Sequence, residues 1–188
     1  MAPPQFPEDL VARLSHLADT RAELLRALDA VAADVTAPTG VAAEWNAAEI
    51  AYHLHLSEKS IAKLLQKRLA AADRGVPAAD EQLRAEWDRV ARLVGLRQAK
   101  VKAPEVADPK SAPPLRDGIE LLQQSRQALL EVLRSAAYTD LLSVSAPHPF
   151  AAIGTLTGAS WLSVVAFHEH RHTGQIEEMR RQGTLTYG

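Results

Sequence analysis

Two histidines four residues apart, His168 and His172, interrupt the apolar face of a helix predicted near the C-terminal end of the sequence. At about 100° per residue, both fall within about 20° of Trp161, at the centre of that face. His170 falls on the opposite side and is expected to face solvent. Neutral imidazoles inside a core need partners, and a pair at this spacing can bind one metal ion. The pattern therefore predicts a metal site on this helix, over residues 161–179.

A third histidine, His53, is placed to complete the site from an earlier helix. On a wheel with Ile50 at zero and about 100° per residue, His53 borders the apolar stripe, whereas His55 points away from it. Three histidines on one side of an ion leave open coordination for water or substrate, which is typical of catalytic metal sites. Core histidines satisfied by hydrogen bonds are the alternative interpretation. We favour a metal site with His53, His168 and His172 as its ligands.

Four polar residues near these histidines are candidates for supporting roles. Glu58 and Glu169 are candidate bases, but both lie at the edges of their apolar stripes, where a surface ion pair is the expected role. Gln175 lies one turn beyond His172 and either orients a ligand or bound water or packs as an amide between helices. His148, between two prolines, either presents a polar group at the mouth of the site or belongs to a packed turn. Glu58 and Gln175 are kept as candidate catalytic residues, and no general base is assigned.

The composition excludes several classes of protein. The chain has 188 residues, 47% of them hydrophobic, and a net charge of −2, with 21 basic against 23 acidic side chains. No basic excess is available to neutralise phosphates, so a nucleic-acid partner is not expected. The absence of cysteine removes disulfides and thiolate ligands, and any thiol chemistry must bring its thiol with the substrate. No signal peptide or membrane span is visible, which predicts a cytoplasmic protein without a membrane partner.

Helical periodicity dominates the chain, and no strand-like alternation competes with it. Asn46 and Glu49 form a predicted capping box at the start of the second helix. The expected long helices cover about 7–35, 46–72, 115–138 and a last one that begins at Thr157 or Ser160 and ends at Gly183. A crossover between the second and third carries an extra helix over 80–95 and a proline-rich loop over 100–114. This order predicts an all-α four-helix bundle with a long crossover, as one domain over 1–188.

The same residues carry a family resemblance that extends over essentially the whole chain. The segments concerned are Trp45-Asn-Ala-Ala-Glu49-Ile-Ala-Tyr-His53-Leu with Glu58, then His148-Pro149, Trp161-Leu and His168-Glu-His-Arg-His172-Thr-Gly-Gln175-Ile. They resemble the motifs of the DinB-like metal-binding four-helix-bundle family. The resemblance implies an up-down-down-up bundle, often dimeric, and a divalent metal, Zn²⁺ or Ni²⁺, held by three histidines. On this sequence those ligands are His53, His168 and His172.

The resemblance also bears on function. Characterised members of the family include bacillithiol S-transferases and the mycothiol-dependent maleylpyruvate isomerase, and many others are described only as metal-dependent hydrolases. The expectation is therefore a metal-dependent enzyme that activates water or a low-molecular-weight thiol against a small-molecule substrate, as a homodimer. The alternative is a non-catalytic stress-response or interaction protein in which the metal is structural.

Overall fold

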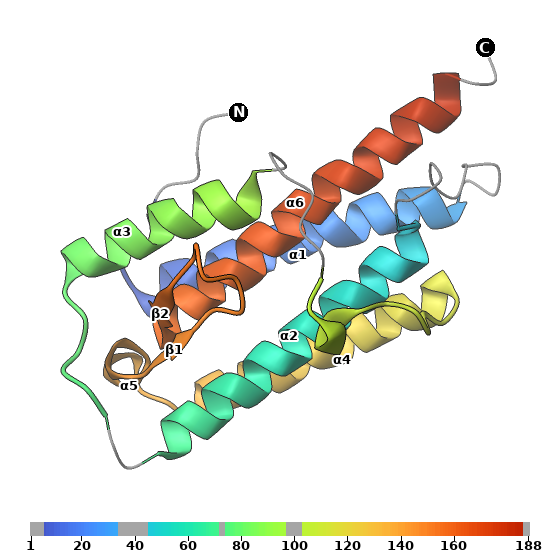
Figure 1. Cartoon of the computed structure of the whole chain (residues 1–188). Coiled ribbons are helices and arrows are strands. Elements are labelled where there is room, and N and C mark those ends of the chain that lie inside the picture. Colours follow the sequence, from blue (N-terminus) through green and yellow to red (C-terminus); the bar gives the residue numbers. More distant parts are fainter. Residues whose placement is uncertain (1–5, 34–44, 72–73, 97–102, 186–188) are drawn as a thin grey trace.

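Four long helices lie side by side in the computed structural model, which describes residues 6–33, 45–71, 74–96 and 103–185 (Figure 1). They are α1 (Leu10–Ala33), α2 (Ala47–Ala70), α4 (Leu115–Arg134) and α6 (Gly158–Leu185). The most extensive packing joins α1 to α6 and α2 to α4. Figure 1 shows that α1 and α6 run in one direction and α2 and α4 in the other. The predicted all-α bundle is confirmed, with the up-down-down-up order that the resemblance implies.

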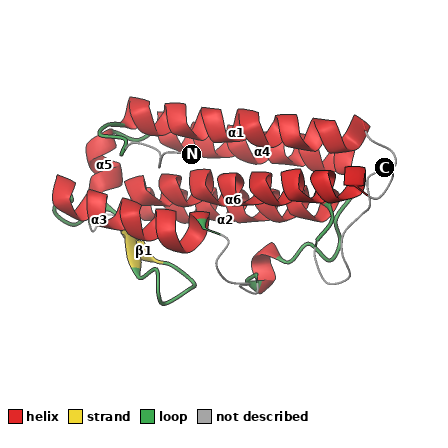
Figure 2. Cartoon of the chain, turned by 90° about the horizontal axis from the view of Figure 1, so that it is seen from above, coloured by secondary structure: helices red, strands yellow, loops and turns green. Residues whose placement is uncertain are grey.

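The two helix pairs stack on each other. In Figure 2, α1 and α4 overlap in one row and α6 and α2 in the other, so that α6 and α2 are neighbours across the gap between the pairs. The chain crosses from α2 to α4 through α3 (Asp80–Val90), a π-helical turn η1 (Ala91–Gly95) and a 3₁₀ turn η2 (Glu105–Ala107). Helix α3 packs on the outside of α6, and η2 packs on α2. The predicted crossover helix over 80–95 is confirmed.

Buried apolar side chains form two separate clusters, one towards each end of the bundle. Leu17 of α1, Leu129 of α4 and Phe167 of α6 belong to the cluster that also includes the crossover helix. Leu24 and Ile176 belong to the cluster at the opposite end. The helix segments between the clusters carry several buried polar side chains, among them Arg21, Glu58, Glu169 and His172. The core is thus divided by a polar layer at the middle of the bundle.

The predicted helix ends need correction at several places. Helix α1 begins at Leu10 rather than Pro7, because the Asp9 carboxylate accepts a hydrogen bond from the backbone N–H of Ala12 at 2.8 Å and caps it. Its predicted stop at 36–40 lies outside the described residues. The capping box of α2 is confirmed. The helix predicted over 115–138 is α4, which ends at Arg134, and a separate short helix α5 (Tyr138–Ser143) follows it.

A two-stranded antiparallel ribbon precedes α6, contrary to the expectation that no strands form. Strand β1 (Ser145–Pro147) pairs with β2 (Thr155–Thr157), and three residues are too few for alternation to be recognised. The hydroxyl of Thr157 accepts from the N–H of Ser160 at 3.2 Å, so Thr157 rather than Ser160 caps α6. The helix continues through Gly183 to Leu185, so the predicted end at Gly183 is wrong.

The start of α6 packs closely against α5, which leads to a prediction about two helical glycines. A Cβ on Gly158 would lie 2.8 Å from the backbone oxygen of Leu141, whereas a Cβ on Gly174 would meet nothing within 4 Å. Gly158→Ala should therefore lower the free energy of unfolding by about 1–3 kcal/mol. Gly174→Ala should raise it by about 0.5–1 kcal/mol, because alanine has the higher helix propensity. Urea denaturation of both variants checks the prediction, and a change of the same sign in both would contradict it.

Within the described ranges, none of the helices is long and apolar enough to cross a membrane.

Candidate metal centre

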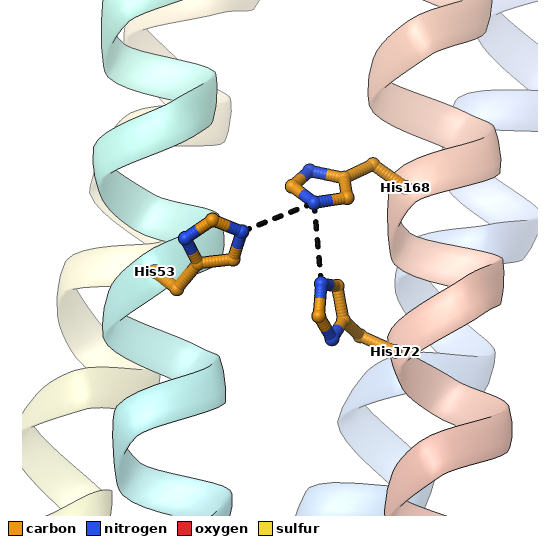
Figure 3. Close-up of side chains that lie close together, drawn as sticks. All are labelled: His53, His168 and His172. Atoms are coloured by element: carbon orange, nitrogen blue, oxygen red, sulfur yellow. Dashed lines mark hydrogen bonds between the residues drawn. The ribbon is translucent and has the colours of Figure 1, made fainter. Parts of the chain in front are cut away.

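Three imidazoles converge in the polar layer, one from α2 and two from α6 (Figure 3). Nε2 of His168 lies 3.1 Å from Nε2 of His53 and 3.2 Å from Nε2 of His172. These are the three residues that the sequence selects as ligands, and the structure brings their ring nitrogens within 4.8 Å of one another. Three nitrogens about 2.0–2.1 Å from one tetrahedral Zn²⁺ lie about 3.3–3.4 Å apart. The two spacings to His168 are close to those of such a site, and the spacing between His53 and His172 is no more than 4.8 Å.

Two of the three rings have their protonation pattern fixed by neighbours. Nδ1 of His53 lies 2.6 Å from the backbone oxygen of Ala107, and Nδ1 of His172 lies 3.0 Å from the side-chain oxygen of Gln175. Because these oxygens only accept hydrogen bonds, each Nδ1 carries the hydrogen and each Nε2 of the neutral ring is a lone pair. A neutral His168 has at most one hydrogen on Nε2 and can donate it either to Nε2 of His53 or to Nε2 of His172, but not to both. Converging lone pairs of this kind fit a cation, and the donor set fits a divalent metal.

Burial lowers the pKa of two of the three rings, His53 and His168. Burial lowers the pKa of His53, and the Ala107 carbonyl and Asp108 only partly oppose it. The pKa of His168 is held well below 6.5 by burial, with further contributions from His172 and His53. Metal binding requires unprotonated imidazoles. Burial of His53 and His168 therefore favours the unprotonated form that metal binding needs.

Trp45 forms an aromatic wall beside the site, and His148 lies in the turn of the β-ribbon. The Trp45 ring lies 4.4 Å from that of His53 and 6.2 Å from that of His172, between ring centroids. His148 belongs to a packed turn: it stacks on Trp161 with centroids 5.3 Å apart, and its Nδ1 accepts from the N–H of Phe150. It nevertheless lies close enough to His168 to depress that residue's pKa.

The burial of His148 leads to a prediction about acid stability in the metal-free protein. Burial lowers the pKa of His148 from 6.5 to about 4. A folded-state pKa below the unfolded value means that the unfolded chain binds protons first, so stability present above pH 6.5 is lost as the pH falls towards 4. The urea midpoint, measured with a chelator present, should be lower at pH 5.5 than at pH 7.5. The fall should be smaller in His148→Gln, and an equal fall in both proteins would contradict the assignment.

The carboxylates that the sequence places at the surface are buried. Glu58 and Glu169 are 2% and 1% exposed, and both are ion-paired with Arg21 and Arg126. The predicted ion pairs form, but the prediction that they lie at the surface is wrong. The edge of each apolar stripe faces a neighbouring helix, and that helix supplies an arginine. Each oxygen of Glu58 accepts from an arginine, which leaves no support for Glu58 as a catalytic base. The side-chain oxygen of Gln175, by contrast, lies 3.0 Å from Nδ1 of His172, and its role in binding a ligand or water stays a prediction.

His55 and His170 lie outside the triad, as predicted, but His55 is buried against another helix. His55 points away from the site yet is buried, because α4 covers that side of α2 and its Leu121 carbonyl accepts from Nδ1 at 2.8 Å. His170 is partly exposed and takes no part in the cluster. Trp45 appears in the sequence motif but was given no role there, and Arg21 and the Ala107 carbonyl were not predicted near the site. For Arg21 a signal existed, since it lies in helical register with the buried leucines of α1.

Comparison with known proteins agrees with this geometry. The sequence profile of the DinB superfamily matches residues 16–176. No curated protein matches the sequence significantly. Among solved structures, the chain is similar to YfiT from Bacillus subtilis, described as a probable metal-dependent hydrolase with an unusual four-helix bundle topology. The two share 17% sequence identity and a TM-score of 0.61, over 96% of this chain and 93% of that one. The likeness in structure shows a common fold, and the profile match, over most of the chain, shows that it belongs to the DinB superfamily.

Proposed function

We propose that this protein is a metal-dependent enzyme in which His53, His168 and His172 hold a divalent ion, Zn²⁺ or Ni²⁺. The observation that carries the proposal is the convergence of two fixed lone pairs on a third imidazole at 3.1 and 3.2 Å. Similarity to YfiT, itself described as a probable metal-dependent hydrolase, adds support. Three protein ligands leave coordination positions open, as in catalytic rather than structural sites.

The residues around the site have distinct roles in this proposal. His53, His168 and His172 would hold the ion, and the ion would supply acidity that ionises water or a thiol near neutral pH. The Ala107 carbonyl and Gln175 hold two of the rings so that Nε2 points into the site. The Trp45 indole covers one side of two ligand rings and limits access of water there. Hydrolysis of a small-molecule substrate is the first candidate reaction.

Transfer of a low-molecular-weight thiol is the second candidate, and the arginine pairing of the buried carboxylates favours it. Glu58 and Glu169 are both taken up by Arg21 and Arg126 and do not serve as bases. A thiol, with a pKa of about 8.5, needs less assistance than water to ionise. Because the sequence contains no cysteine, the thiol would come with the substrate. A homodimer with the site facing a small-molecule substrate remains a prediction.

Assays of metal-free and reloaded protein test the proposal. Protein stripped with a chelator and reloaded with Zn²⁺ or Ni²⁺ should hydrolyse 4-nitrophenyl acetate, or conjugate a low-molecular-weight thiol to monochlorobimane. The stripped protein and reloaded His172→Ala should do neither. If the reloaded wild type binds the ion and gains a higher melting temperature but turns over no ester or thiol adduct, the metal is structural. The alternative of a non-catalytic stress-response or interaction protein would then hold.

A further inference from the structure

A ring of four charged side chains, three of them buried and the fourth, Arg126, partly buried, lies beside the histidine site in the polar layer. The charge ring consists of Arg21 from α1, Glu58 from α2, Arg126 from α4 and Glu169 from α6. Arg21 donates to Glu169 and to Glu58, each at 2.7 Å. Arg126 donates to Glu58 at 2.6 Å and to Glu169 at 2.9 Å. Each arginine thus binds both glutamates, and every bundle helix contributes one charge.

The charge ring joins the two closely packed helix pairs across the gap between them. Arg21 reaches from the α1–α6 pair to Glu58 on α2, and Arg126 reaches from the α2–α4 pair to Glu169 on α6. Each guanidinium also donates to a backbone oxygen of the opposite pair: Arg21 to Leu122 at 2.6 Å and Arg126 to Leu17 at 2.7 Å. Because a backbone oxygen is fixed to its helix, these bonds define the register of one pair against the other.

The three histidines span the same gap. His53 lies on α2, and His168 and His172 lie on α6. Glu169 directly follows His168, and Glu58 lies five residues after His53, which is about 7.5 Å along the helix axis. Metal ligands tolerate deviations of only about 0.2 Å. A change of register that the ring prevents would therefore separate His53 from the other two ligands.

Hydroxyl groups complete the hydrogen bonds of the two glutamates in the charge ring. The remaining oxygen of Glu169 accepts from the hydroxyl of Thr20 at 2.9 Å, and Glu58 also accepts from Ser125 at 2.7 Å. Buried ion pairs add little net stability compared with apolar side chains of the same size, and fixing a register is their best-attested use. A fully satisfied network adds to that specificity. Because the charge ring lies next to the three histidines, the register that it fixes also sets the spacing between His53 and the histidines of α6.

We propose that the charge ring positions the metal site, by setting the register of α2 against α6 at which the three Nε2 atoms converge. Arg21, Glu58, Arg126 and Glu169 are then positioning residues of the site. The inference rests on the proposed function, since it assigns the ring to a metal centre.

The test compares two buried carboxylates, one in the ring and one outside it. Glu58→Gln removes a charge from the ring while keeping its shape. The matched control is Glu86→Gln: Glu86 is also buried but accepts from Thr157, at the start of α6. Affinity for Zn²⁺ is measured by chelator competition, Co²⁺ coordination by its visible absorption spectrum, and stability by thermal melting.

Glu58→Gln should weaken Zn²⁺ binding roughly tenfold or more and alter the Co²⁺ spectrum. Glu86→Gln should keep the wild-type values even where its melting temperature falls as far. If Glu58→Gln does not fold, Ser125→Ala, which removes one bond to Glu58, carries the same comparison with a smaller shift. Wild-type affinity and spectrum in the folded ring variant would overturn the inference and leave the metal site standing. Failure of the wild type to bind either ion would overturn both the proposed function and this inference.

Discussion

Replacing His172 by alanine should reduce bound Zn²⁺ from about one ion per chain to less than about a tenth, after reloading and dialysis. The reason is that only two of three imidazoles would remain, and catalytic zinc sites depend on three protein ligands. Removing His172 also removes one of the two rings whose tautomer is fixed, since its Nδ1 faces Gln175. Elemental analysis of the dialysed protein measures the effect.

The same helix provides a matched control for that experiment. His170 lies two residues away, is partly exposed and does not belong to the cluster. His170→Ala should therefore keep the wild-type metal content. Equal metal content in His172→Ala and the wild type, or an equal loss in His170→Ala, would contradict the assignment of the ligands.

Replacing Arg21 by methionine should lower the free energy of unfolding by about 3–5 kcal/mol, because removing one member of a buried ion-pair network leaves its partners uncompensated. Two glutamates would then share Arg126, whose pKa is raised because Glu169 and Glu58 outweigh the opposing effect of burial. The change would also remove the bond to the Leu122 carbonyl. Urea denaturation at pH 7.5 gives the free energy.

An exposed ion pair serves as the reference for this measurement. Arg134 donates to Glu131 on the surface of α4, and both side chains are more than half exposed. Arg134→Met should change the free energy of unfolding by less than about 0.5 kcal/mol, as exposed pairs generally contribute little. A loss in Arg21→Met no larger than that in Arg134→Met would contradict a continuous buried network.

The convergence of the three histidines could be predicted from sequence because His168 and His172 interrupt an apolar stripe and His53 borders another, and an apolar stripe faces the core whatever the neighbouring helices are. The two histidines of α6 needed only the helical period, and His53 needed a second helix with a clear stripe. Membership of the DinB superfamily, which the motifs indicate, is confirmed by the profile match over 16–176. The capping box at Asn46 and Glu49 was equally local and is confirmed.

The charge ring could not be predicted in the same way, because its partners come from four helices. Glu58 and Glu169 lie at the edges of their stripes, and a single-helix wheel does not say whether an edge meets water or another helix. His55 illustrates the same point, since α4 covers a side of α2 that the wheel leaves outside. The β-ribbon was not predicted, because two strands of three residues are too short to show an alternating pattern in the sequence.

Anomalous diffraction tests the central claim most directly. Crystals of protein purified without added metal, measured on both sides of the zinc and nickel absorption edges, should show one anomalous peak within about 2.2 Å of Nε2 of His53, His168 and His172. The edge at which the peak appears identifies the ion. A peak at other residues, or none at the three histidines even after crystals are soaked in Zn²⁺, would contradict the metal centre.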